Sequence, residues 1–550
     1  MVDLPVERHR RIWQTFSVVG LCLGTLFFAA SLTPSLLPRA YFVQGILSGA
    51  SLALGYGLGV FAVWLWRYLE LPEPRRSPRL YGKWAMALLC VAVAMLFLWK
   101  AAGWQNSIRD LMGLAPVDTA HPTKVGGIAF VLFLLLIGIG RGLSRVYFLI
   151  SGWLKRFMPR RVAYVLGFVL VGLLAASLVD RVLLRYALRV ADSAYAALDA
   201  LFEDGIEQPG DPLKTGGPGS LIDWDTLGRT GRSFVVEGPR GEEIAAFTGR
   251  PALEPMRVYV GLRSAESSAA RARLALTELE RIGAFERSVL VVVAPTGTGW
   301  VDPEGADTLE YLHDGDTVMV AQQYSYLTSW LSLLIEPSYG AEAAHDLFRE
   351  VYARWKTLPK ETRPKLYLYG LSLGALSSEQ SSELFDILAD PFQGALWAGP
   401  PFNSRIWRSV TRDRNTGSPA WLPRFRDGSV VRFTAQENAL DIPGAVWGPL
   451  RVVYLQYASD PVVFFDPLAW YRRPAWLIGA RGPDVSPQLR WYPMVTFLQL
   501  ALDMALATTA PLGHGHLYAP EHYIDAWMAV TDPQGWPPAE IERLKAALAK

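Results

Sequence analysis

Cysteine is almost absent from this chain of 550 residues, which contains only Cys22 and Cys90. Both lie in apolar stretches near the amino terminus, so the rest of the chain can form neither disulfides nor a thiolate metal site. Charge is also scarce, because charged residues make up 19% of the chain and the formal net charge is +2. So small a charge gives no reason to expect nucleic acid as a partner. Nothing in the sequence calls for a metal or another cofactor.

In place of charge, the first 180 or so residues carry a series of long apolar runs. A helix needs about 20 apolar residues to cross the hydrocarbon of a bilayer, and Trp gathers at the bilayer surface. We therefore predict five membrane spans; a buried soluble bundle is the alternative, which the Trp residues at the edges of the runs disfavour. The spans are 13–35, 41–66, 84–99, 125–140 and 162–179. The apolar stretch 146–154 is interpreted as an interfacial helix.

Basic residues gather on one side of these spans. The amino terminus and the connectors after the second and fourth spans hold Arg8, Arg10, Arg11, Arg67, Arg75, Arg76, Arg79, Lys83, Arg141, Arg145, Lys155, Arg156, Arg160 and Arg161. The other side holds fewer. Because positive loops stay in the cytoplasm, we predict a multi-pass protein of the cytoplasmic (inner) membrane, with a cytoplasmic amino terminus and everything after 179 outside.

Small residues recur four apart inside the predicted spans, at Gly20/Gly24, Gly45/Gly49 and Gly55/Gly59. Such pairs let two helix backbones approach closely. Packing within one bundle is favoured, and an interface between copies of the chain is the alternative. No span centre carries an ionisable residue, which argues against an ion pathway.

Beyond a helix at 181–201 and a Gly- and Pro-rich loop at 208–219, short apolar runs alternate with amphipathic stretches. This alternation predicts a doubly wound, mainly parallel sheet covered by helices. We divide the chain into a transmembrane helical domain (1–201), a linker (202–256) and a catalytic domain (257–550). Strands are expected at 258–262, 289–293, 318–321, 366–369, 395–398 and 452–457, and helices at 268–282, 342–355, 379–388 and 521–530.

The fourth of these strands runs into Gly370-Leu-Ser372-Leu-Gly374. A strand followed by G-x-S-x-G and small residues is typical of a nucleophile elbow, a strained turn that presents a serine hydroxyl to solvent. The pattern indicates hydrolysis or acyl transfer through a serine ester, with Ser372 as the nucleophile.

Partners for the serine are sought later in the chain, since this fold orders them as serine, acid, histidine. His514 and His516 lie in a Gly-rich loop before a helix, and the sequence does not decide between them. His522 lies inside that helix and is interpreted as a surface residue. Asp460, just after a strand, is the expected acid, and Asp466 is the second choice.

An oxyanion hole would combine the amide of Leu373 with amides of the loop 295–300, where Thr296 and Gly297 are the candidates. The alternative is an ordinary Gly-rich turn. The loop lacks the spacing of a nucleotide-binding P-loop.

The chain resembles a bacterial family of membrane-anchored α/β-hydrolases that join a multi-span domain to a hydrolase domain. The resemblance is carried by the segment 31–39 (SLTPSLLPR), by the serine motif at 370–374 and by Gly513-His-Gly-His-Leu-Tyr518. It covers nearly the whole length and implies an α/β-hydrolase fold with Ser372 as nucleophile, but no particular substrate. The segment 31–39 falls at the outer end of the first span, where it is expected to meet the hydrolase domain.

Together these observations predict a membrane serine hydrolase that cleaves a lipid-like carboxylic ester at the outer face of the cytoplasmic membrane. One alternative is an acyltransferase with the same residues, which an assay with competing acceptors would distinguish. Another is a non-catalytic scaffold that uses a hydrolase fold for binding, which would not react with a fluorophosphonate.

Overall fold

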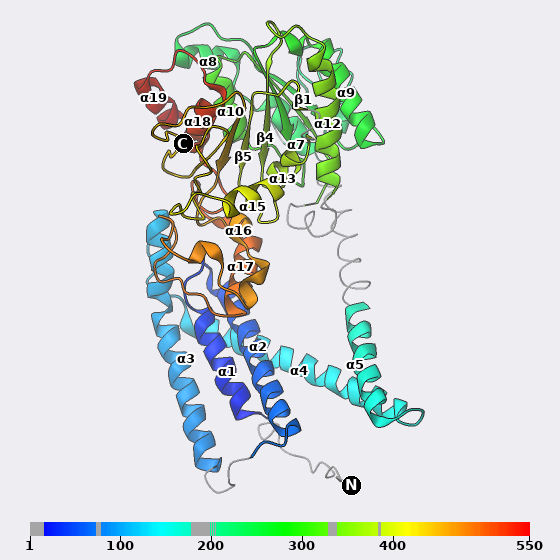
Figure 1. Cartoon of the computed structure of the whole chain (residues 1–550), viewed down its shortest axis with the longest axis vertical. Coiled ribbons are helices and arrows are strands. Elements are labelled where there is room, and N and C mark those ends of the chain that lie inside the picture. The colour runs from blue at the N-terminus through cyan, green and yellow to red at the C-terminus, as the bar shows by residue number, and fades with distance from the viewer. Residues whose placement is uncertain are drawn as a thin grey trace. The chain divides into compact units, whose positions relative to one another are not determined.

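The computed structural model of the chain describes residues 16–72, 79–177, 199, 201, 203, 205–327, 338–382 and 387–549. The chain forms two compact units (Figure 1), which are described separately. Unit 1 comprises Met1–Leu184 and Asp466–Leu506, and unit 2 comprises Arg185–Phe465 and Ala507–Lys550. The expected catalytic domain, 257–550, is therefore interrupted by a segment that belongs to unit 1. The expected helix at 181–201, and several of the basic residues used for orientation, lie outside the described residues.

Long apolar helices dominate unit 1. Its helices before residue 178 are α1 (Val18–Ser31), α2 (Tyr41–Tyr68), α3 (Arg79–Arg109), η2 (Asp110–Met112), α4 (Pro122–Leu154) and α5 (Arg160–Ser177). Within the described residues, four helices are long and apolar enough to cross a membrane: Tyr41–Tyr68, Gly82–Met112, Pro122–Leu154 and Arg160–Ser177. These helices indicate a membrane-associated protein.

Two expectations about the spans are wrong. In the described part of the first predicted span, 16–35, the helix is the 14-residue α1, which at about 21 Å is shorter than a hydrocarbon core of about 30 Å. Pro34 and Pro38 follow it and oppose helix formation in the segment 31–39. The separate interfacial helix expected at 146–154 is instead the continuous end of α4.

The paired glycines of unit 1 bring helix backbones together within the chain. A Cβ at Gly59 would lie 2.6 Å from the Cα of Gly20, and one at Gly55 would lie 2.7 Å from the carbonyl oxygen of Leu23. A Cβ at Gly49 of α2 would lie 2.8 Å from the carbonyl oxygen of Ala129 in α4. The glycines therefore serve the α1–α2 and α2–α4 contacts of the bundle.

The segment 466–506 completes unit 1 through its helix α17 (Val495–Ala505). The side chain of Asp503 accepts hydrogen bonds at 3.0 Å from the Arg39 guanidinium and from the Leu36 amide. Gln499 donates to the carbonyl oxygen of Thr33 at 3.0 Å. The Arg39 and Asp503 side chains are 1% and 0% exposed. The segment 31–39 therefore contacts residues of the segment 466–506. These residues were expected to belong to the hydrolase domain, but the structure assigns them to unit 1.

A parallel sheet of seven strands forms unit 2, in the order β1-β3-β2-β4-β5-β7-β6. The strands are β1 (Met256–Val260), β2 (Val289–Ala294), β3 (Thr317–Gln322), β4 (Lys365–Leu371), β5 (Gly394–Ala398), β6 (Val431–Thr434) and β7 (Arg451–Leu455). Nearly every strand residue is buried, as expected for a sheet covered on both faces. The strand β6 was not predicted, because Arg432 interrupts its apolar pattern. The Arg432 guanidinium donates to the carbonyl oxygens of Gly428 and Leu440.

Helices cover the sheet in two groups (Figure 1): α9, α12 and α13 pack on one face, while α18 packs on the other with α10 and α19. The helices of unit 2 are α7 (Gly228–Val236), α8 (Gly241–Thr248), α9 (Ser268–Arg281), α10 (Pro303–Leu312), α12 (Tyr339–Lys356), α13 (Leu373–Glu379), α15 (Arg405–Arg412), α16 (Pro461–Phe464), α18 (Pro520–Thr531) and α19 (Pro538–Leu548). The helix expected at 379–388 is not continuous, since α13 ends at Glu379.

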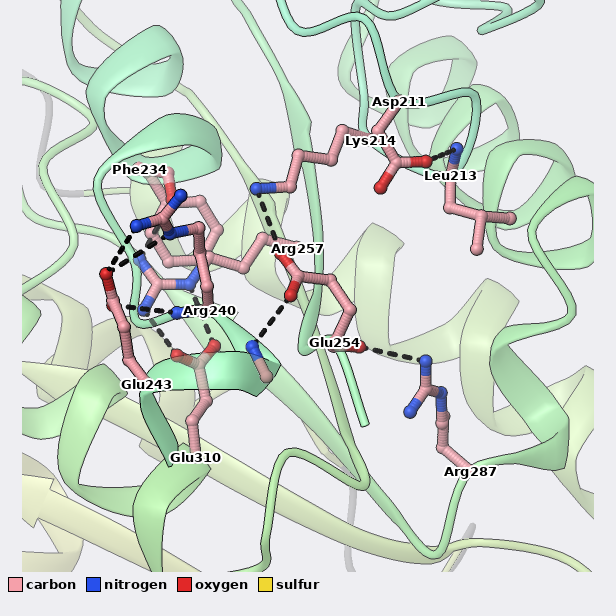
Figure 2. A network of polar contacts seen from close by, with 11 residues as sticks. Asp211, Leu213, Lys214, Phe234, Arg240, Glu243, Glu254, Arg257, Arg287 and Glu310 are labelled. Carbon is pink, nitrogen blue, oxygen red and sulfur yellow. Dashed lines mark hydrogen bonds and ion pairs between the residues drawn. The ribbon is translucent and has the colours of Figure 1, made fainter. Parts of the chain in front are cut away.

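Residues expected to form a linker are folded against the edge of this sheet. Figure 2 shows Arg257 of β1 bonded to Glu310 of α10 at 2.7 and 2.8 Å and to the carbonyl oxygen of Phe234 in α7 at 2.9 Å. Glu254 pairs with Lys214 at 3.2 Å and accepts from the Gly241 amide. Because both side chains are buried, loss of Arg257 would leave the Glu310 charge uncompensated, whereas Arg257 has a second carboxylate partner, Asp307, at 2.6 Å.

Candidate functional site

Ser372 occupies a strained turn between β4 and α13. Its φ of 56° and ψ of −124° lie in a region that side chains rarely adopt. A Cβ at Gly370 would lie 2.4 Å from the carbonyl carbon of Gly374, and one at Gly374 would lie 2.1 Å from the carbonyl oxygen of Ala294. The spacing of the G-x-S-x-G motif is therefore a steric requirement of this turn.

The serine side chain is covered, in contrast to the solvent exposure expected from the motif. Ser372 is 5% exposed. Its amide donates to the carbonyl oxygen of Ala398 at 2.9 Å, which anchors the turn to the end of β5.

Asp460 lies five positions after the end of β7 and caps the start of α16, and it is fully buried. One carboxylate oxygen accepts from the Val462 amide at 2.8 Å. The other oxygen accepts from Nδ1 of His516 at 2.7 Å and from the Tyr518 hydroxyl at 2.6 Å. Asp466, the second choice, instead caps a 3₁₀ turn in unit 1 by accepting from the Leu468 amide.

His516 presents its second ring nitrogen to the interior. Because Nδ1 donates to Asp460, Nε2 is left as an acceptor; it is buried and has no hydrogen-bond partner among the described residues. A Cβ at Gly399 would lie 2.7 Å from Cε1 of this ring. Gly399 follows Ala398, which binds the Ser372 amide, so the imidazole lies against the same strand end as the elbow.

His514 and His522 are placed differently. The His514 amide donates to the carbonyl oxygen of Pro511, and no bond joins the His514 ring to Asp460 in the described structure. His522 is buried, not a surface residue as expected, and it bonds the Tyr457 hydroxyl at 2.5 Å. Burial lowers the pKa of His522 to about 4. Of the three histidines, the structure pairs His516 with the expected acid.

The loop 295–300 follows β2 next to the elbow, but its amides are not equivalent. The Thr296 amide donates to the carbonyl oxygen of Trp300 at 2.9 Å and so closes the loop itself. The Tyr259 hydroxyl donates to the carbonyl oxygen of Gly299 at 2.7 Å, which fixes the loop from β1. Leu373 begins α13, as expected. The Thr296 amide is therefore already engaged within the loop.

Tyr518 is the residue whose importance the sequence analysis missed. Its hydroxyl shares an oxygen of Asp460 with His516, and its side chain is fully buried. The only available signal was a tyrosine two positions after His516. The described residues contain no group of three or more His, Cys, Asp or Glu side chains that could hold a metal ion.

Comparison with protein-family models gives two matches. The model described as alpha/beta-hydrolase family matches residues 256–544. The model described as alpha/beta-hydrolase family N-terminus matches residues 32–239. Searches of curated proteins and of solved structures each returned no significant match.

Proposed function

Because the chain belongs to the alpha/beta-hydrolase family, we propose that it is a membrane-bound serine hydrolase that cleaves a carboxylic ester. The observation that carries the proposal is the arrangement around Asp460, in which a buried carboxylate orients His516 beside the strained turn of Ser372. An acid, an imidazole and a hydroxyl in this order form the catalytic set of many acyl-transfer enzymes.

In the proposed reaction, Nε2 of His516 takes the Ser372 hydroxyl proton while Oγ attacks the ester carbonyl carbon. The carbonyl electron pair moves onto its oxygen, where the amide of Leu373 binds it. His516 then gives the proton to the leaving alkoxide as the C–O bond breaks, which releases an alcohol and leaves an acyl-serine. Water attacks the acyl carbonyl carbon while His516 takes its proton. His516 returns this proton to Oγ of Ser372 as the bond between Oγ and the acyl carbon breaks, which releases the carboxylic acid.

A lipid-like ester is the substrate class that suits this chain. Four apolar helices of membrane-spanning length occur in the same polypeptide, so lipids are its nearest esters. Aromatic side chains near the proposed acid add apolar surface, with the rings of Phe402 and Phe465 packed edge to face at 4.9 Å. The basic connectors after α2 and α4 support a catalytic domain at the outer face of the cytoplasmic membrane, because α5 then leads from the cytoplasmic side to the outer side.

The test uses full-length protein in detergent and a fluorophosphonate probe. Ser372→Ala is expected to abolish labelling and ester turnover, because it removes the attacking oxygen. Ser377→Ala, in the same short helix, is the matched control and is expected to keep both. Full turnover by Ser372→Ala would refute the hydrolase assignment. Absence of labelling on folded wild-type protein would favour a non-catalytic binding role.

An acyltransferase reaction remains the alternative within the same chemistry. Its support is the low exposure of Ser372 and His516, at 5% and 7%, because a covered acyl-enzyme excludes water. Product analysis with added alcohols or sugars distinguishes the two reactions. Transfer to these acceptors in preference to water would favour the transferase.

A further inference from the structure

The segment 466–506 carries a basic and aromatic surface that the proposed catalysis does not use. It covers one end of the helices of unit 1, as its contacts show. Asp503 and Gln499 bind the segment 31–39 after α1, and Ser486 bonds the hydroxyl of Ser107, near the end of α3, at 2.8 Å. In Figure 1, α17 lies beside these helix ends. This surface therefore lies where apolar helices of the unit begin or end.

Three arginines of this segment lie close together, and we call them the arginine patch: Arg473, Arg481 and Arg490. The guanidinium groups of Arg473 and Arg481 both donate to the carbonyl oxygen of Leu477. Arg481 also donates to the carbonyl oxygen of Leu489, which adjoins Arg490. Burial lowers the pKa of Arg481, and repulsion from Arg473 and Arg490 lowers it further.

The positive charge of the patch is not balanced inside the described structure. No carboxylate of the described residues forms an ion pair with any of the three arginines. The Nε of Arg481 is buried and has no hydrogen-bond partner among those residues. Like charges held together without a counter-charge cost free energy, so the patch favours an anion. Guanidinium forks suit phosphate oxygens in particular.

Exposed aromatic and aliphatic side chains accompany the patch. Trp470, Tyr471 and Ile478 are 48%, 54% and 64% exposed. The backbone beside them is held in place, because Trp491 donates to the carbonyl oxygen of Ala469 at 2.8 Å and the Met494 amide donates to that of Trp470 at 2.9 Å. Trp and Tyr beside Arg are the combination that proteins place at the headgroup level of a bilayer.

We propose that the arginine patch binds the phosphate of an anionic phospholipid headgroup, with Trp470, Tyr471 and Ile478 inserted at the bilayer surface. The charge of the patch complements the phosphodiester, and its continuity with apolar helices in one unit supports a lipid as the source of that phosphate. This inference does not depend on ester cleavage at Ser372.

The experiment measures lipid binding to full-length protein purified in neutral detergent. Native mass spectrometry counts retained phosphatidylglycerol after titration, with phosphatidylcholine and inorganic phosphate as separate arms. The double variant Arg473→Ala/Arg481→Ala is expected to bind phosphatidylglycerol about tenfold or more weakly than wild type. The charge-matched control is Arg408→Ala/Arg424→Ala, whose side chains are exposed in unit 2. It is expected to bind as wild type does.

Further arms keep the proposal falsifiable. If the alanine pair does not fold, Arg490→Ala and Arg473→Lys/Arg481→Lys are expected to give smaller losses of phosphatidylglycerol binding. Equal binding by wild type and all patch variants would overturn the proposal. So would equal binding of phosphatidylcholine, or displacement of the lipid by millimolar inorganic phosphate. Fluorophosphonate labelling of Ser372 in the same samples reports the proposed function separately.

Discussion

At the scale of single residues, the Gly513–Tyr518 loop combines two roles in neighbouring positions. His516 and Tyr518 both bind Asp460, and the backbone just before His516 is held by the Gly515 amide, which donates to the Ser459 hydroxyl at 2.9 Å. His516 and Tyr518 therefore face the carboxylate of Asp460. His514, which lies between Gly513 and Gly515, forms no bond to it in the described structure. Because the two histidines are two positions apart, a two-residue shift of the loop would exchange them.

This arrangement predicts opposite results for the two histidines. His516→Ala is expected to reduce fluorophosphonate labelling and ester turnover by about a thousandfold or more, because the serine loses its base. His514→Ala is expected to keep labelling within a few-fold of wild type and serves as the matched control. Rates of labelling measured on full-length protein decide between them. The reverse result would move the proposed base to His514.

Tyr518 gives a second prediction at this scale. Tyr518→Phe removes one donor from the buried Asp460 carboxylate while keeping the ring. A hydrogen bond to a charged group contributes about 1.5 kcal/mol or more, so kcat is expected to fall about tenfold while KM stays unchanged. Active sites counted by probe titration correct for unfolded protein. A fall explained entirely by fewer active sites would mean that Tyr518 only stabilises the fold.

At the scale of elements, the α10–α18 layer buries two histidines. His313 follows α10 and bonds the Thr531 hydroxyl of α18 at 2.9 Å, and His522 lies in α18 itself. Burial lowers the pKa of each to about 4, from an ordinary value of 6.5. Both imidazoles are therefore neutral in the folded protein at neutral pH.

The layer is expected to lose stability on acidification. Between pH 6.5 and 4 the unfolded chain binds more protons at these histidines than the folded chain, so the free energy of unfolding falls as pH falls. Each histidine contributes at most about 3 kcal/mol to this loss. Thermal unfolding of full-length protein from pH 7.5 to 4.5 measures it. His313→Asn is expected to flatten the profile, whereas His345→Asn, on α12, is expected to leave it unchanged; equal profiles would contradict the assignment.

At the scale of the whole molecule, the chain leaves unit 2 after Phe465 and returns to it at Ala507. The excursion begins six residues after Asp460 and ends ten residues before His516, so both proposed catalytic partners lie close in sequence to a crossing between the units. Within unit 1, the excursion is tied down by the buried ion pair of Arg39 and Asp503. A segment near the amino terminus is thereby bonded to one near residue 500.

Removal of one partner of this pair is expected to destabilise unit 1. Arg39→Ala or Asp503→Ala leaves a buried charge uncompensated, at a cost of about 3–5 kcal/mol. The double variant Arg39→Met/Asp503→Leu replaces the pair by apolar side chains and is expected to lose much less. Thermal unfolding and limited proteolysis of full-length protein in detergent measure the effect. Additive losses in the double variant would show that the two residues do not interact.

The sequence by itself was sufficient for features that depend on local pattern. Apolar runs indicated membrane-spanning helices because a bilayer demands length and hydropathy, although the run at 13–35 proved to hold only the short α1. Alternating strands and helices indicated the parallel sheet. Gly370 and Gly374 indicated the nucleophile elbow at Ser372, because a side chain at either position would collide with neighbouring backbone atoms. The strand β6 was not predicted because Arg432 interrupts its apolar pattern. The buried guanidinium is accommodated by carbonyl oxygens outside the strand, those of Gly428 and Leu440.

Only the tertiary structure decided which groups meet. The ring of His516 binds Asp460 because the loop that carries it turns toward the carboxylate. The local sequence around His514 and His516 does not predict which of the two side chains this turn directs at Asp460. Likewise, α17 belongs with helices more than 400 positions earlier because Asp503 finds its counter-charge in Arg39, and pairing of buried charges over such distances leaves no periodic trace in the sequence.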